Sequence, residues 1–193
     1  MSKKIHNLTG ISILSALIIV LTMVAGGIRI GPFSITLALV PIIIGSALYG
    51  ASAGAILGAV MGITVIIFSI ATGDIGVMTL LNQNPLACIL VCILKSTLAG
   101  WIAGLVYGLV AKKSPKAGVI AAGITCPVVN TTVFILGMIL FFFSAVEAGA
   151  NGQKILNYAI TGMAGINFLI ELAINMALAS VITYIIRYAA NRN

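Results

Sequence analysis

Long apolar runs separated by short polar segments set the pattern of this chain. The polar breaks stand at 27–34, 72–85, 112–116 and 145–157. A helix that spans a membrane needs about 20 apolar residues, with a range of roughly 17–25. The run between 35 and 71 exceeds that length, so we expect it to break near Gly50–Gly54. The pattern predicts six membrane helices, at 8–26, 35–50, 53–71, 86–111, 117–144 and 158–187.

The composition agrees with a membrane protein, because 61% of the residues are hydrophobic and only 7% are charged. A soluble domain is typically about a quarter charged. We therefore expect an all-α, polytopic membrane bundle that forms a single integral membrane domain over residues 1–193. The three cysteines, Cys88, Cys92 and Cys126, all fall inside apolar runs, and we interpret them as small packing residues rather than a metal site or a disulfide.

The distribution of Lys and Arg predicts the orientation of the chain. Loops on the cytoplasmic side of a membrane protein carry an excess of these cations. With six spans, the outer side holds two, Arg29 and Lys154, together with the acids Asp74 and Glu147. We expect both termini in the cytoplasm, on the side that holds Lys3, Lys4, Lys112, Lys113, Lys116, Arg187 and Arg192.

Glycines recur every four residues in two of the predicted helices. Small residues at this spacing let the backbones of membrane helices approach closely. We expect these faces to pack tightly within the bundle rather than to bind a partner. The two series are Gly50, Gly54, Gly58 and Gly62, and Gly100, Gly104 and Gly108.

Two ionisable residues lie deep inside apolar runs. Glu171 belongs to a polar stripe with Asn167 and Asn175 in the last run, and Lys95 stands alone in the fourth. Ionisable groups within a membrane span are costly and mark functional sites by default. With a helical rise of about 1.5 Å per residue, the depths of Lys95 and Glu171 differ by about one turn. The two are therefore either an ion pair that holds helices together or the floor of a binding pocket.

Further polar residues extend this predicted site. Asn130 lies in the fifth helix at a similar depth, on a face shared with Phe134. Three residues in the predicted outer loops, Arg29, Asp74 and Asn84, would cover the pocket from outside. The substrate-binding set is therefore Lys95, Asn130, Asn167, Glu171, Arg29, Asp74 and Asn84.

Catalytic chemistry finds little support in the sequence. The single histidine, His6, lies near the cytoplasmic end of the first helix, and no phosphate-binding loop, metal-spaced ligand set or nucleophile–base pair is visible. We expect a binding or transport protein without a cofactor or a metal. Any ATP used in transport would be hydrolysed by another chain.

Three stretches resemble one known family. They are PIIIGSALYGASAGAILGAVMGI (41–63), NPLACILVCILKSTLAGWIAGLVYGLVAKK (84–113) and PVVNTTVFILG (127–137). Together with six short spans, they resemble the substrate-binding S components of energy-coupling factor (ECF) vitamin transporters. The resemblance implies a prokaryotic cell membrane, a transmembrane coupling subunit and two cytoplasmic ATPase subunits as partners. It also implies a pocket built from helices four to six and the outer loops after helices one and three.

The resemblance further implies a surface for the coupling subunit. In the family, an Ala-x-x-x-Ala pair on the first helix makes this contact, and the matching positions here are Ser12 and Ala16.

The substrate class remains open between vitamins, with pantothenate slightly favoured. Its carboxylate would meet Lys95 or Arg29, and its hydroxyl and amide groups would meet Asn130 and Asn167. Riboflavin or a flavin-like compound is the main alternative substrate. A stand-alone permease with Glu171 and Lys95 as a proton relay, and a purely structural bundle, are the rival functions.

Overall fold

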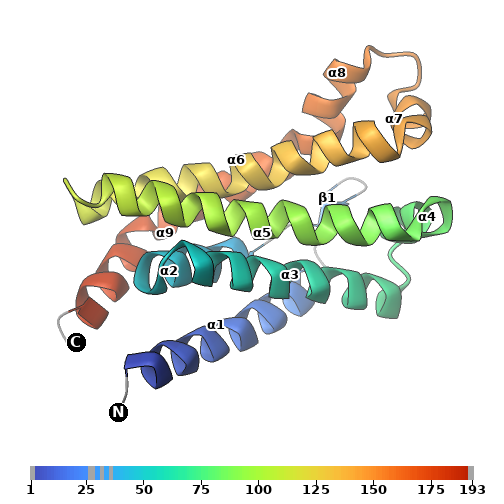
Figure 1. Cartoon of the computed structure of the whole chain (residues 1–193). Helices are drawn as coiled ribbons and strands as arrows, with labels where there is room; N and C mark the ends of the chain where they lie inside the picture. Colours follow the sequence, from blue (N-terminus) through green and yellow to red (C-terminus); the bar gives the residue numbers. More distant parts are fainter. Residues whose placement is uncertain (1–2, 26–28, 31–32, 35–36, 191–193) are drawn as a thin grey trace.

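The computed structural model describes residues 3–25, 29–30, 33–34 and 37–190 of the chain. Long helices lie side by side along one axis, and short elements gather at one end of the bundle (Figure 1). The elements are α1 (Lys3–Ala25), β1 (Arg29–Ile30), β2 (Phe33–Ser34), α2 (Leu39–Tyr49), α3 (Ala51–Thr72), α4 (Ile75–Gln83), α5 (Pro85–Val110), α6 (Pro115–Phe141), α7 (Phe143–Ala150), α8 (Ile155–Tyr158), the π-helix η1 (Ala159–Ala164) and α9 (Gly165–Ala190).

Five of the described helices are long and apolar enough to cross a membrane. They lie within α1, α3, α5, α6 and α9. The second predicted helix, at 35–50, is represented among the described residues by α2, which has 11 residues. At 1.5 Å per residue α2 measures about 16 Å, roughly half of the hydrocarbon core of a bilayer. The described chain therefore has five helices of spanning length and one short apolar helix, and the count of six spans stays a prediction.

The segments predicted as outer loops contain short ordered elements. The segment at 72–85 holds α4, and the segment at 145–157 holds α7 and the start of α8. The segment at 27–34 holds an antiparallel ladder in which Arg29 pairs with Ser34 and Ile30 with Phe33. The all-α prediction is confirmed for the bundle, and this two-residue ladder is the exception within the described chain.

The last apolar run is not one continuous helix. The sequence predicts a helix over 158–187, but the π-helix η1 occupies Ala159–Ala164 and α9 begins only at Gly165. Gly165 has φ 39°, a conformation that glycine adopts without steric cost. π-helical turns of this kind interrupt α-helices mostly at functional sites. The first turns of this run therefore follow a different path from the one that its composition predicts.

The glycine series of α3 packs directly on the backbone of α5. A Cβ on Gly58 would collide with the carbonyl oxygen of Ser96, and one on Gly62 would lie 2.6 Å from the carbonyl oxygen of Cys92. The prediction of tight packing is confirmed for these positions. It is wrong for Gly108, whose Cβ would meet nothing within 4 Å. Gly50, with φ 91°, forms the turn between α2 and α3 instead.

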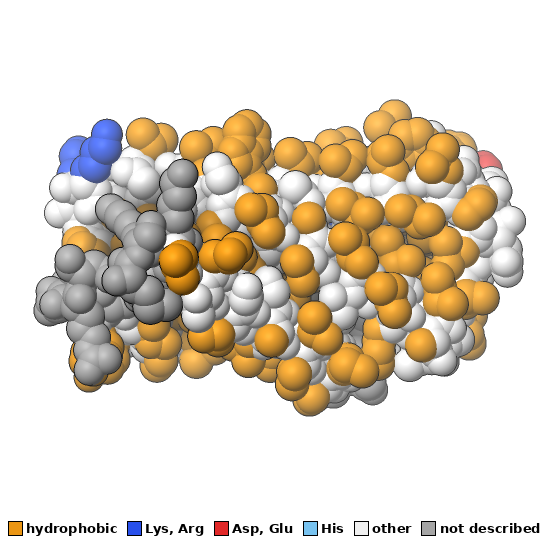
Figure 2. All heavy atoms as spheres, turned by 60° about the horizontal axis from the view of Figure 1, so that its bottom comes forward, with side chains coloured by type: hydrophobic (Ala, Val, Ile, Leu, Met, Phe, Trp, Pro, Cys, Tyr) orange, Lys and Arg blue, Asp and Glu red, His pale blue; other side chains and the backbone are white. Residues whose placement is uncertain are grey.

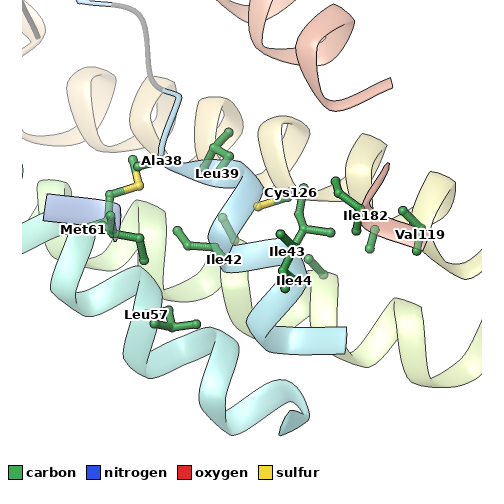
Figure 3. Packing of buried hydrophobic residues seen from close by; sticks show 14 of the residues in the cluster. Ala38, Leu39, Ile42, Ile43, Ile44, Leu57, Met61, Val119, Cys126 and Ile182 are labelled. Atoms are coloured by element: carbon green, nitrogen blue, oxygen red, sulfur yellow. The ribbon is translucent and has the colours of Figure 1, made fainter. Parts of the chain in front are cut away.

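Two apolar clusters build the core. The first surrounds the short helix α2, whose Leu39, Ile42 and Ile43 meet side chains from α3, α6 and α9 (Figure 3). The second lies nearer the short helices and contains residues of α5, α6 and α7. Cys126 belongs to the first cluster, and Cys88 and Cys92 belong to the second, as expected for packing residues.

Charge separates the two ends of the bundle. Figure 2 shows Lys or Arg side chains at one end, an acidic side chain at the other, and a wide apolar surface between them. The chain ends and the turn between α5 and α6 lie at one end, and α4, α7 and α8 lie at the other (Figure 1).

Candidate functional site

The contacts between α5, α6 and α9 fix the relative heights of their polar residues. The helices α5 and α6 run antiparallel, with Gly137 against Val91 near one end and Gly118 against Ala111 near the other. On the other side of the site, Gly123 of α6 packs against α9 at Met176 and Asn175. Heights along α6 therefore serve as a common scale for all three helices.

Lys95 projects from α5 onto an aromatic ring of α6. Its Nζ lies 4.8 Å from the centroid of the Phe134 ring. Both side chains are half-buried. A cation within about 6 Å of a ring centroid is attracted by the negative face of the ring, and the attraction grows when the cation is desolvated. The ammonium is thus placed by a neighbouring helix at the height of Phe134.

Asn130 lies one turn further along α6 from Phe134, toward the middle of the bundle. The residue is 5% exposed. Its Oδ1 is buried and accepts no hydrogen bond from the described residues. A buried acceptor without a donor costs about 1–3 kcal/mol of stability. Contact of this oxygen with a ligand stays a prediction.

Glu171 and Asn175 are buried on the face of α9 that meets α6. The Nδ2 atom of Asn175 donates a hydrogen bond of 3.4 Å to the carbonyl oxygen of Gly123. Glu171 is one turn before Asn175 on α9, so it lies about one turn from Gly123 along α6, near the height of Cys126. Asn175 therefore joins the two helices, and Glu171 lies at the height of Cys126.

Lys95 and Glu171 do not form the ion pair that the estimate of their depths allows. Lys95 stands at the height of Phe134 and Glu171 at the height of Cys126, which is about 12 Å lower along the axis of α6. Among the residues that it describes, the structure records no ion pair between the two. Depths counted from the helix ends miss this difference because the relative heights of α5 and α9 are set by their packing on α6.

Two of the predicted covering residues act as helix caps. The Oδ1 of Asp74 accepts a hydrogen bond of 3.0 Å from the backbone N–H of Val77 at the start of α4. The Oδ1 of Asn84 accepts one of 3.1 Å from the N–H of Ala87 at the start of α5. These bonds satisfy helix N-termini. Contact of either residue with a ligand stays a prediction.

The remaining predicted site residues cannot be placed by their side chains. The backbone of Arg29 lies in β1 and that of Asn167 lies in α9, but both side chains are outside the described part of the structure. Ser12 and Ala16 are exposed on α1.

A lateral groove of about 570 Å³ lies between α6 and the segment formed by η1 and α9. Val128 and Thr132 line it, and each is two residues from Asn130, so on an α-helix they point to the nearly opposite face. Leu169, also in the lining, is 60% exposed. The groove therefore opens on the outer surface of the bundle, away from the polar residues of the interior.

Phe134 is named in the sequence only for the face it shares with Asn130, and the predicted substrate-binding set does not include it. Its spacing of four from Asn130 indicates a shared helix face. The contact with Lys95 depends on the register between α5 and α6, which no local pattern reveals.

A family model decides what kind of site this is. The model for the substrate-specific component of the ECF transporter matches residues 6–187. The chain belongs to this family. It is thus a multi-pass, substrate-binding and non-catalytic subunit of an ECF importer, and a small molecule and the other ECF components are its partners. No curated protein matches the chain.

The polar residues of α5, α6 and α9 lie inside the apolar frame of this S component. A subunit that selects a solute needs hydrogen-bonding and charged groups inside an apolar frame. Lys95 and Asn130 are such groups.

Proposed function

We propose that this S component captures pantothenate, a vitamin with one carboxylate, two hydroxyls and one amide. Lys95 binds the carboxylate, and Asn130 accepts a hydrogen bond from a hydroxyl or the amide N–H. Arg29, Asn167, Glu171, Asp74 and Asn84 complete the set from α9 and the outer segments.

The buried Oδ1 of Asn130 carries this proposal. It needs a donor, and the cation of Lys95 stands one turn further out, about 6 Å away along the axis. A ligand that serves both must carry an anion at one end and a hydrogen-bond donor several bonds away. Pantothenate has this arrangement, because an ethylene group separates its carboxylate from the amide, and the hydroxyls follow.

Riboflavin is the second candidate. A flavin ring needs a flat aromatic surface on which to stack, and the interior ring at this height, Phe134, is covered by the Lys95 ammonium. Phe168 lines the outward-facing groove instead. The interior therefore favours a flexible anion over a flat ring system.

Isothermal titration of the purified chain tests the substrate. We expect pantothenate to bind at one per chain, and Lys95→Met to weaken it roughly 10- to 150-fold, since hydrogen bonds to charged groups contribute about 1.5–3 kcal/mol. Lys112→Met makes the same change at an exposed position outside the bundle and is the matched control. Tight binding of riboflavin without binding of pantothenate would replace the proposed substrate.

We infer further that the chain works in a prokaryotic cell membrane with both termini in the cytoplasm, together with a transmembrane coupling subunit and two ATPases. The exposed position of Ser12 and Ala16 supports the contact with the coupling subunit. The rival is a stand-alone permease. Uptake by vesicles that hold only this chain, driven by a proton gradient without ATP, would favour that rival.

A further inference from the structure

We infer that Phe134 is a positioning residue, which holds the Lys95 ammonium ready for the carboxylate of the substrate and so makes the site selective for anions. This inference rests on the proposed function and deepens it. It concerns the contact of 4.8 Å between the Lys95 Nζ and the centroid of the Phe134 ring.

The contact joins two helices whose separation is fixed. Phe134 belongs to α6 and Lys95 to α5. One turn from this pair, a Cβ on Gly137 would lie 2.6 Å from Cγ2 of Val91, so the two backbones approach as closely as their side chains permit. The Phe134 ring itself packs against the second apolar cluster. The ring is therefore a rigid surface, and the flexible partner is the lysine.

The choice of partner matters for the charge. A carboxylate beside Lys95 would neutralise the ammonium and compete with an anionic substrate. A ring attracts the ammonium through its quadrupole and carries no net charge, so the positive charge remains available to a ligand. Glu171, the buried acid of α9, lies about 12 Å lower along the axis of α6, because Asn175, one turn after it, packs against Gly123.

The geometry also leaves hydrogen-bond donors for the substrate. A lysine ammonium has three N–H donors. The ring lies on one side of the nitrogen, so donors on the other sides are available to carboxylate oxygens. Binding then requires no large movement of the lysine, so the entropy cost of ordering its long side chain has been met before the ligand arrives.

Paired ligands separate this role from simple packing. Panthenol is pantothenate with its carboxylate replaced by an alcohol, so it shares every group except the anion. We expect Phe134→Leu to lower the affinity for pantothenate roughly three- to tenfold. The affinity for panthenol, which is already low, should change less than about twofold. Phe134→Tyr keeps the ring face and should restore the affinity for pantothenate. Phe141→Leu, at an exposed ring of the same helix, is the matched control. Equal losses for both ligands, or no loss for pantothenate, would overturn the inference.

A measurement without ligand keeps the inference testable if pantothenate does not bind at all. Stacking on a ring shifts the Cε protons of a lysine upfield in the NMR spectrum. In the chain labelled at lysine Cε, we expect one upfield resonance that is missing in Lys95→Met, lost in Phe134→Leu and retained in Phe134→Tyr. If the titration shows no binding of pantothenate but the upfield resonance behaves as expected, pantothenate is rejected as the substrate and the positioning of Lys95 by Phe134 is retained. A resonance unaffected by Phe134→Leu would reject the positioning role itself.

Discussion

Gly54 of α3 and Gly100 of α5 face each other so closely that a Cβ on either residue would collide with the carbonyl oxygen of the other. The contact continues along both helices through Gly58 and Gly62 of α3. Side chains are excluded from this seam, and helix backbones touch directly, as small residues allow in lipid.

Adding one methyl group to this seam should weaken the bundle. We expect Gly58→Ala to lower the free energy of unfolding by about 1–3 kcal/mol, because the helices must separate to accept the Cβ. Thermal unfolding of the purified chain in detergent measures the effect. Gly108→Ala is the control, since nothing lies within 4 Å of its Cβ, and it should be neutral or slightly stabilising. Equal effects of the two changes would contradict the packing described for α3 and α5.

Asn130 should show opposite effects on binding and stability. Asn130→Leu removes a buried oxygen that lacks a donor, so we expect the ligand-free chain to become more stable by about 1–3 kcal/mol. The same change should lower the affinity for pantothenate roughly fivefold, because one hydrogen bond contributes about 1 kcal/mol. Unfolding curves and titrations on one preparation compare the two. A loss of stability in Asn130→Leu would indicate that the oxygen has a structural partner.

Lys95 and Glu171 should contribute to stability independently. Residues more than about 7–10 Å apart usually give additive effects within roughly 0.5 kcal/mol. We therefore expect a double-mutant cycle of Lys95→Met and Glu171→Met to give a coupling energy near zero. Breaking a buried ion pair costs about 3–5 kcal/mol, and a double variant that recovered such a loss would show that the charges are paired after all.

Cysteine labelling tests the orientation. In a background without the three native cysteines, Lys113→Cys and Gln153→Cys place thiols at exposed positions on opposite ends of the bundle. We expect a membrane-impermeant reagent to label Gln153→Cys from outside the cell and Lys113→Cys only after the membrane is opened. Labelling of both from outside would rule out cytoplasmic placement of the turn between α5 and α6.

The exposed face of α1 should matter for uptake and not for capture. Ser12→Trp or Ala16→Trp adds bulk where the coupling subunit is proposed to approach, so we expect uptake to fall more than tenfold while ligand affinity stays within about twofold. Ile124→Trp is the control for added bulk. Ile124 lies about nine residues after the start of α6, and Ser12 lies about nine residues after the start of α1, so the two positions have the same depth. Loss of ligand binding in Ser12→Trp would assign that surface to the pocket.

Periodic features of this chain could be predicted from its sequence. The four-residue spacing of Gly54, Gly58 and Gly62 indicates a helix face, and the face is used as expected. The break between α2 and α3 falls at Gly50, inside the predicted interval. Both follow from local geometry, in which one turn of helix repeats the same side.

The sequence does not predict features that depend on a single backbone angle or on how two helices align along each other. Gly165 looks like the other glycines of the apolar runs, yet its positive φ separates the π-helical turn η1 from α9. The capping role of Asn84 has a sequence signal, because a proline such as Pro85 commonly occupies the first position of a helix. The contact between Lys95 and Phe134 joins two helices and leaves no trace in either segment alone.

The short helix α2 leaves part of the membrane layer to backbone that is not helical. Because α2 crosses only about half of the hydrocarbon core, the layer beyond its first residue, Leu39, is left to the chain that contains the β1–β2 ladder. Backbone that is not helical persists at such depth only against protein or water. The pairs of Arg29 with Ser34 and of Ile30 with Phe33 therefore satisfy, between two short strands, backbone groups of a kind that a longer helix would have satisfied within itself.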